Sequence, residues 1–195
     1  MIEVGDTVVL DTETLAKDKR SLVVTLSAVR FNRSDNGIPI VVEDGQLLYS
    51  GKNMLDLKLN VAEQLLAGRT VDPLTVDWWN RQNHKARLQL VDRPDLQMKA
   101  KEALTMLAEF IDGAQVYCRG TDFDPPILAS LYADFGMEVP WRYNEVRDVR
   151  TYIDALSGGT KGYLSGWEKP AWFVAHNSLH DCLRDALQMQ KAAAR

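Results

Sequence analysis

The chain has 195 residues, of which 46% are hydrophobic and 26% are charged. This usage is typical of a soluble globular protein, and the length predicts one compact domain over residues 1–195. Its 23 Lys and Arg residues are outnumbered by 27 Asp and Glu residues, which gives a net charge of −4. Such a balance argues against a protein that holds nucleic acid by bulk positive charge. It is compatible with an enzyme that meets phosphates through metal ions, because carboxylates hold such ions.

The sequence gives no sign of a membrane span, a signal peptide or a disulfide framework. Uninterrupted apolar runs are short, such as Val8–Leu10 and Ala171–Ala175, and fall far below the ~20 residues of a membrane helix. The N-terminus has no basic segment followed by an apolar one. Cys118 and Cys182 are isolated and lack the paired spacing of a zinc site. We therefore expect a cytoplasmic protein with no membrane partner.

The first half of the chain is predicted to begin with strands. Thr7–Glu13 and Ser21–Phe31 are rich in β-branched residues, and Ile38–Leu48 follows a turn signal. Short connections predict that these three strands form an antiparallel meander. The segment Leu57–Leu74 has no clear pattern. Helices are expected over Val76–Arg87 and Asp95–Ile111.

The second half of the chain alternates strands and helices. Strands followed by such an alternation predict an α/β fold with a mixed central sheet. We expect the first three strands to be antiparallel and the helices to cover both faces of the sheet. The predicted strands are Gln115–Cys118 and Glu145–Val149, and the predicted helices are Pro125–Phe135, Arg150–Leu156 and Ser178–Ala193.

Two acids, Asp11 and Glu13, lie at the end of the first predicted strand. Alternate residues of a strand point to the same face, so the two carboxylates project together. Like charges held this close repel unless a cation lies between them, and Mg²⁺ or Mn²⁺ prefers such oxygen ligands. The alternative is a surface turn with two solvated acids.

A third acid, Asp124, lies where a predicted strand passes into a predicted helix. A carboxylate at such a junction either serves a site or caps the helix. Asp122 is the competing acid in this segment. Phe123, between them, is expected in the core or stacked on a substrate.

The segment from His176 to Asp181 leads into the last predicted helix. Five residues correspond to about 140° around a helix, so the two side chains converge only if His176 precedes the helix. Asn177 or Ser178 is a suitable N-cap for that arrangement. A loop histidine beside a metal-binding carboxylate is suited to remove a proton from water, and an ordinary surface histidine is the alternative. His180 is expected to be structural.

The order of these motifs resembles the DEDD exonuclease superfamily, in the branch whose last motif carries His. The motifs are an acid pair on the first strand, Phe-Asp before a helix, and His followed by Asp five residues later. Many members follow the acid pair with Thr-Gly, where this chain has Thr14 and Leu15. Further segments resemble the exodeoxyribonuclease A family of T-even-type phages, namely Thr75–Gln82, Val116–Gly120, Phe123–Leu128, Arg147–Thr151 and Phe173–Cys182.

This resemblance implies an RNase H-like fold and a 3′-5′ exonuclease that uses two Mg²⁺ or Mn²⁺ ions. The implied metal ligands are Asp11, Glu13, Asp124 and Asp181. Asp11 would bridge the ions, and His176 would be the general base. The implied partner is single-stranded nucleic acid, with DNA favoured over RNA and nucleoside 5′-monophosphates as products. Candidate substrate contacts are Thr12, Thr14, Leu15, Phe123, Trp79 and Arg150.

Two other functions stay open from the sequence. An exoribonuclease of the same fold differs only in substrate, and no residue decides between the two sugars. A catalytically inactive module that binds nucleic acid would be marked by the loss of an acid, whereas all four are present. Relatives in this branch include dimers, so a homodimer is a further expectation, although no interface stripe is evident in the sequence.

Overall fold

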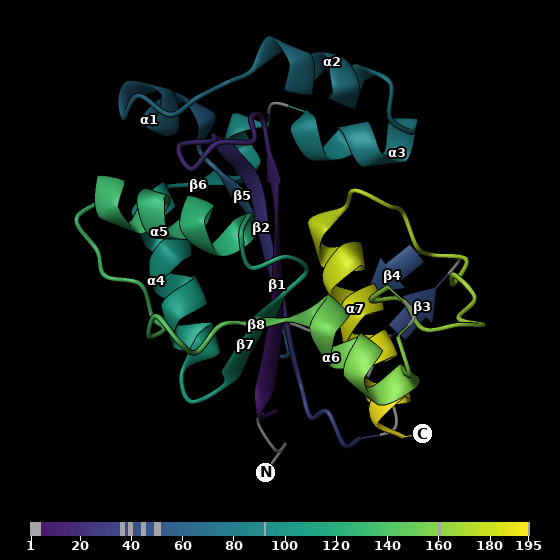
Figure 1. Cartoon of the computed structure of the whole chain (residues 1–195). Coiled ribbons are helices and arrows are strands. Elements are labelled where there is room, and N and C mark those ends of the chain that lie inside the picture. The colour runs from purple at the N-terminus through teal and green to yellow at the C-terminus, as the bar shows by residue number, and fades with distance from the viewer. Residues whose placement is uncertain are drawn as a thin grey trace.

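The computed structural model describes residues 5–35, 38, 41–43, 46–48, 52–91, 93–159 and 161–194. Within these residues a six-stranded mixed sheet has the order β6-β5-β2-β1-β7-β8 (Figure 1). Strand β1 is antiparallel to β2, β2 is antiparallel to β5, and β1 is parallel to β7. The strands are β1 Thr7–Thr14, β2 Val23–Phe31, β5 Met54–Leu59, β6 Gln97–Met98, β7 Gln115–Cys118 and β8 Arg147–Asp148.

Helices cover both faces of this sheet. Figure 1 shows α4 and α5 on one side, α6 and α7 on the other, and α1, α2 and α3 at one end. The predicted fold class, a mixed sheet with three antiparallel strands and helices on both faces, is therefore confirmed. The helices are α1 Val61–Leu66, α2 Pro73–Asn80, α3 His84–Arg87, α4 Ala100–Ile111, α5 Asp124–Asp134, α6 Val149–Ser157 and α7 Ser178–Ala193, with short 3-10 turns η1 Leu88–Leu90 and η2 Pro94–Leu96.

The third strand of the sheet is not the predicted one. Ile38–Leu48 contains β3 (Val41–Glu43) and β4 (Gln46–Leu48), which pair with each other in a separate two-stranded sheet. The neighbour of β2 is instead β5. The apolar residues of β5 alternate, so that Leu55, Leu57 and Leu59 all enter one buried cluster. Part of the predicted strand lies outside the described residues.

Two predicted helices have different bounds, for local reasons. The single helix expected over Val76–Arg87 is wrong, because α2 begins three residues earlier with its N-terminus capped by Asp72 and α3 is capped separately by Asn83. The helix expected from Asp95 begins only at Ala100. Before it, β6 extends the sheet beside β5, and Leu96 is 60% exposed.

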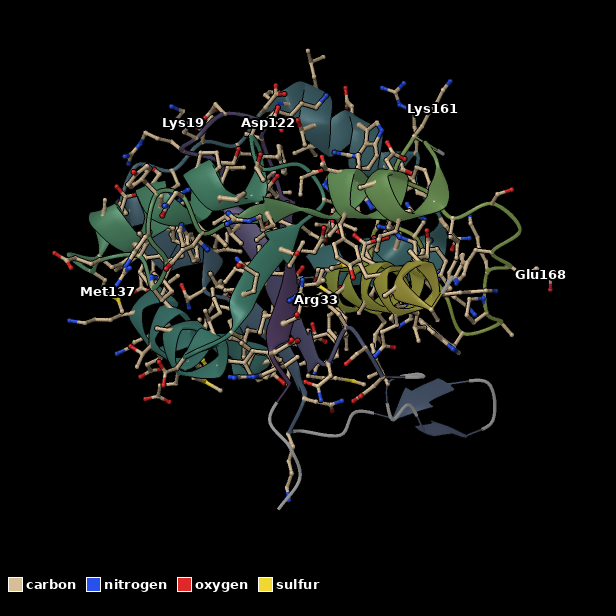
Figure 2. The ribbon with its side chains drawn as sticks, turned by 60° about the horizontal axis from the view of Figure 1, so that its bottom comes forward. Lys19, Arg33, Asp122, Met137, Lys161 and Glu168 are labelled. Carbon is tan, nitrogen blue, oxygen red and sulfur yellow. The ribbon has the colours of Figure 1, made fainter. Side chains whose placement is uncertain are left out.

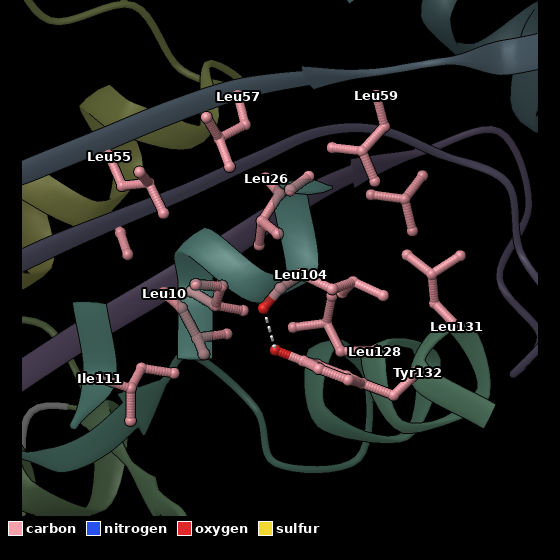
Figure 3. Close-up of a cluster of buried hydrophobic side chains, with 14 of the residues drawn as sticks. Leu10, Leu26, Leu55, Leu57, Leu59, Leu104, Ile111, Leu128, Leu131 and Tyr132 are labelled. Carbon is pink, nitrogen blue, oxygen red and sulfur yellow. Dashed lines mark hydrogen bonds between the residues drawn. The ribbon is translucent and has the colours of Figure 1, made fainter. Parts of the chain in front are cut away.

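Successive side chains of β1 point to opposite faces of the sheet, and this alternation decides which face each acid reaches. Val8 and Leu10 belong to a cluster with α4 and α5, in which Tyr132 donates a hydrogen bond to the carbonyl of Leu104 (2.8 Å; Figure 3). Val9 belongs to the cluster on the opposite face, beneath α6 and α7. Asp11 and Glu13 continue the register of Val9, so they point to the α7 face, whereas Thr12 points to the α5 face. No helix among the described residues is long and apolar enough to cross a membrane.

Candidate active site

Three carboxylates from β1 and α7 meet at the end of β1. Oxygen atoms of Asp11, Glu13 and Asp181 all lie within 4.8 Å of one another, a grouping that can hold a metal ion. Asp181 lies in the first turn of α7 and is buried, as is Glu13. Residues separated by 170 positions in the chain therefore form one acidic cluster.

Asp124 reaches this cluster from the other face of the sheet. It lies in the first turn of α5 and is 3% exposed. Its Oδ1 accepts hydrogen bonds from the backbone N–H of Thr12 (3.0 Å) and from the Thr12 hydroxyl (2.6 Å). Because Thr12 lies between Asp11 and Glu13, these bonds fix Asp124 beside the acid pair. The competing acid Asp122 is exposed at the rim of the same cleft.

Burial raises the affinity of all four acids for protons. Burial raises the pKa of the Asp11 carboxyl well above its ordinary value, and the charge of Asp124 adds to this effect. Burial also raises the pKa of Glu13, with the charge of Asp181 as the second cause. The pKa of Asp181 is raised by burial, which the Arg184 guanidinium partly offsets. Such a cluster is unfavourable as four bare charges and requires protons or cations.

We expect the metal-free protein to lose stability as the pH rises. Burial raises the pKa of Asp124 from 3.8 to about 6, so the folded chain holds a proton that the unfolded chain releases. This stabilisation is full below about pH 4 and is lost as the pH passes about 6. When the pH rises from about 5 to about 7.5, the ionisation of Asp124 alone lowers the free energy of unfolding by about 1.4 kcal/mol.

Urea unfolding in EDTA at these two pH values measures this effect. An Asp124→Asn variant should show a smaller difference between the two free energies of unfolding, because the amide does not titrate. An equal difference in the variant and in the original chain would contradict the assignment of this proton to Asp124.

His176 lies on the turn before α7, as the sequence predicts. Asn177 is the N-cap, accepting a hydrogen bond from the N–H of His180, and α7 begins at Ser178. His176 has a left-handed backbone (φ 62°), and its N–H donates to Oδ2 of Asp181 at 2.9 Å. Its ring lies edge-on to Trp78, with 4.9 Å between centroids. His180 is buried, accepts the N–H of Val174 on Nδ1, and is structural as expected.

Two arginines beside the acids were missed by the sequence reasoning. Arg184 forms ion pairs with Asp181 and with Asp185 (2.7 Å). Arg119 pairs with the same Asp185 at 2.9 Å. The sequence spacing could have indicated the Arg184 ion pairs, because residues 181, 184 and 185 are spaced three and four apart and so share one face of a helix.

A cleft of about 590 Å³ opens above these acids. Trp79 forms part of its floor, is 1% exposed and donates its ring N–H to the carbonyl of Thr14 (3.0 Å). Its neighbour Trp78 is 39% exposed, and Leu15 is not among the described residues that line the cleft. The other predicted substrate contacts, Thr12, Thr14, Phe123 and Arg150, do line it.

The cleft lies at one end of the sheet. Figure 2 shows Asp122, on the cleft rim, and Lys161 along the same edge of the molecule, away from Arg33. Arg33 lies near the opposite end of β1, where it contacts the hydroxyl of Tyr117 (3.1 Å) and the carboxylate of Asp6 (3.6 Å). The acids are therefore gathered at the end where β1 finishes.

The fold is RNase H-like, and solved exonucleases share it. One similar solved structure is S. pombe Pop2p in a Mg²⁺- and Mn²⁺-bound form, with a TM-score of 0.61, 10% identity, and coverage of 98% of this chain and 84% of that chain. Another is E. coli ExoI in a complex with single-stranded DNA, with a TM-score of 0.55 and 10% identity. That match covers 98% of this chain, which spans 40% of the ExoI chain. At this identity the likeness shows the fold.

The sequence comparison identifies the family. Residues 6–195 match the 3′-5′ exoribonuclease Rv2179c-like domain family, and the chain belongs to it. The exodeoxyribonuclease of Enterobacteria phage T4 is 29% identical over an alignment of 215 positions. The alignment covers 94% of this chain and 87% of the phage protein. The protein is therefore an exonuclease, a hydrolase of nucleic acid.

Proposed function

We propose that residues 1–195 form one exonuclease domain that removes nucleotides from the 3′ end of single-stranded DNA, with two Mg²⁺ or Mn²⁺ ions. The observation that carries this proposal is the meeting of Asp11, Glu13 and Asp181, whose oxygens lie within 4.8 Å of one another. Asp124, fixed by Thr12, supplies the fourth acid. This is a donor set of oxygen atoms only, which suits hard divalent ions.

The acids fit a pair of such ions. Asp11 would bridge them, as the resemblance of the motifs implies, and its oxygens lie within 4.8 Å of those of Glu13 and Asp181. Glu13 and Asp181 would complete one metal position, and Asp124 would serve the other. When bound, the ions supply positive charge that stabilises the attacking and leaving oxygens of a phosphodiester.

His176 is proposed to accept the proton of the attacking water. Its backbone bond to Asp181 and its ring contact with Trp78 hold it at the cleft. Histidine is the side chain that most often serves as a general base, and the ring of His176 is held beside the acids. The water would attack the terminal phosphodiester and release a nucleoside 5′-monophosphate.

The cleft walls are proposed to hold the last nucleotides of the strand. Phe123 offers an aromatic face beside the acids, and Arg150, which lines the same cleft, offers a cation for a phosphate. Thr12 and Thr14 supply hydroxyl groups there. For Trp79 and Leu15, direct substrate contact stays a prediction, because Trp79 is buried and Leu15 lies outside the lining.

DNA is proposed as the preferred substrate because the phage T4 relative, an exodeoxyribonuclease, covers nearly the whole chain. The description of the family as exoribonucleases favours RNA as the second candidate. Matched 5′-labelled DNA and RNA oligonucleotides of one sequence, digested in Mg²⁺, decide between them. We expect DNA to shorten faster from its 3′ end, with nucleoside 5′-monophosphates released. Faster loss of RNA would support the exoribonuclease, and no product from either oligonucleotide, even in excess Mn²⁺, would support an inactive binding module.

Two further expectations concern the protein in the cell. If the chain is encoded by a phage, as its T4 relative is, the proposed place of action is the cytoplasm of the host. A homodimer stays a prediction, which the mass measured by sedimentation equilibrium would test.

A further inference from the structure

A strongly basic segment lies in this acidic chain. Residues 81–93, here called the basic segment, contain four Arg and Lys residues and one acid, so their formal charge is +3. The rest of the chain carries 19 basic and 26 acidic residues, a charge of −7. Positive charge is thus concentrated in a short stretch that the proposed reaction does not use. The four basic residues are Arg81, Lys85, Arg87 and Arg93.

The basic side chains point into solvent from a fixed backbone. Arg81, Lys85 and Arg87 are exposed, and none of them forms an ion pair with an acid among the described residues. The backbone beneath them is held by the Asn83 cap and by Ala86, which is 1% exposed. Exposed and unpaired cations on such a support are available for a polyanion.

The basic segment lies next to the cleft. It follows directly after α2, whose Trp78 lines the cleft and contacts the ring of His176. Figure 1 shows α3 beside α2, above the end of α7 at which that helix begins. A strand with its 3′ end at the acids therefore has this surface within reach.

A second groove lies beside the basic segment. It has a volume of about 420 Å³, and its lining includes Thr25 on β2, the carboxylate of Asp56, and Leu88, Val91 and Leu96. Thr25 lies directly opposite Glu13 in the pairing of β1 with β2. The groove is therefore one strand away from the acidic cluster. Leu88, Val91 and Leu96 are between 45% and 60% exposed and offer contact area to bases, whereas a fourth apolar residue of the lining, Leu57, is buried.

We propose that the basic segment binds the phosphates of single-stranded nucleic acid upstream of the 3′ end held in the cleft. The proposal rests on the proposed exonuclease function and adds to it a surface that holds long substrates. Lys85 and Arg87 contact backbone phosphates, and the groove beneath receives the adjacent nucleotides. Because phosphate contacts release counterions, binding through this surface depends strongly on salt.

The test is a double substitution, Lys85→Gln with Arg87→Gln. Fluorescence anisotropy measures its affinity for a labelled 20-nucleotide DNA, with Ca²⁺ in place of Mg²⁺. We expect affinity to fall roughly tenfold or more at about 50 mM salt, and the slope of log K against log salt to become shallower by about 1.4. The kcat/KM for a dinucleotide, which has no upstream phosphate, should stay within about twofold of the original.

A matched control removes two exposed cations elsewhere, by Arg142→Gln with Lys191→Gln. Arg142 lies near the start of β7, and Lys191 lies in the last turn of α7, both away from the cleft. Unchanged affinity and salt slope in the Lys85 and Arg87 variant would overturn the proposal, as would an equal loss in the control. A change in oligomeric state with unchanged DNA affinity would assign the surface to a second copy of the chain instead.

These outcomes are distinct from a failure of the proposed function. If the original chain cleaves neither the dinucleotide nor the 20-nucleotide DNA, the exonuclease proposal fails. The anisotropy comparison still decides whether the basic segment holds the strand, because it does not depend on cleavage.

Discussion

An Asp11→Asn variant is expected to lose at least about 10³-fold in kcat on a labelled DNA oligonucleotide. Oxygens of Asp11 lie within 4.8 Å of those of Glu13 and Asp181, and its carboxylate is the one proposed to bridge two ions. Loss of about 4 kcal/mol of transition-state stabilisation corresponds to that factor. Initial rates in Mg²⁺ measure it.

The same variant separates chemistry from folding. Neutralising Asp11 removes one buried charge from a repelling cluster, so the metal-free variant should unfold at no lower urea concentration than the original chain. Asp77→Asn, on the exposed surface of α2, is the matched control and should keep its full rate. A rate within tenfold of the original in the folded Asp11→Asn variant would remove Asp11 from the site.

A His176→Gln variant is expected to lose about 10²- to 10⁴-fold in kcat on a dinucleotide, the range of general acid–base catalysis. The variant keeps the backbone N–H that donates to Asp181, so the acidic cluster should stay in place. Without an acceptor for its proton, the attacking water depends on hydroxide, and the residual rate should rise about tenfold per pH unit.

The control for this prediction is His84→Gln. His84 lies on α3, is exposed, and is not among the described residues that line the cleft. Its substitution should leave the rate on the dinucleotide unchanged. If His176→Gln retains the original rate and pH profile, another group accepts the proton.

The elements that could be predicted from sequence are those set by neighbours in the chain. The alternation of β1 brings Asp11 and Glu13 to one face, and Asn177 fixes the start of α7 between His176 and Asp181. Both arrangements depend on residues within a few positions of one another. The meeting of β1 with Asp124 and Asp181 depends on the whole fold, and only the resemblance of the motifs indicated it.

The wrong strand assignment and the undecided orientation of Trp78 and Trp79 also come from contacts between residues far apart in the chain. Whether Ile38–Leu48 or Met54–Leu59 pairs with β2 is decided by long-range packing, and Met54–Leu59 has no β-branched or aromatic residue that would mark it as a strand. Trp78 and Trp79 are about 100° apart on α2, so one must face the core, and the sequence does not say which. The structure buries Trp79 and leaves Trp78 partly exposed.

A crystal soaked in Mn²⁺ reveals whether Asp11, Glu13, Asp124 and Asp181 together hold divalent ions. We expect two anomalous peaks in the cleft, each about 2.0–2.6 Å from oxygens of these carboxylates. Crystals soaked in Mn²⁺ that show no peak at these four carboxylates would contradict the proposed metal site.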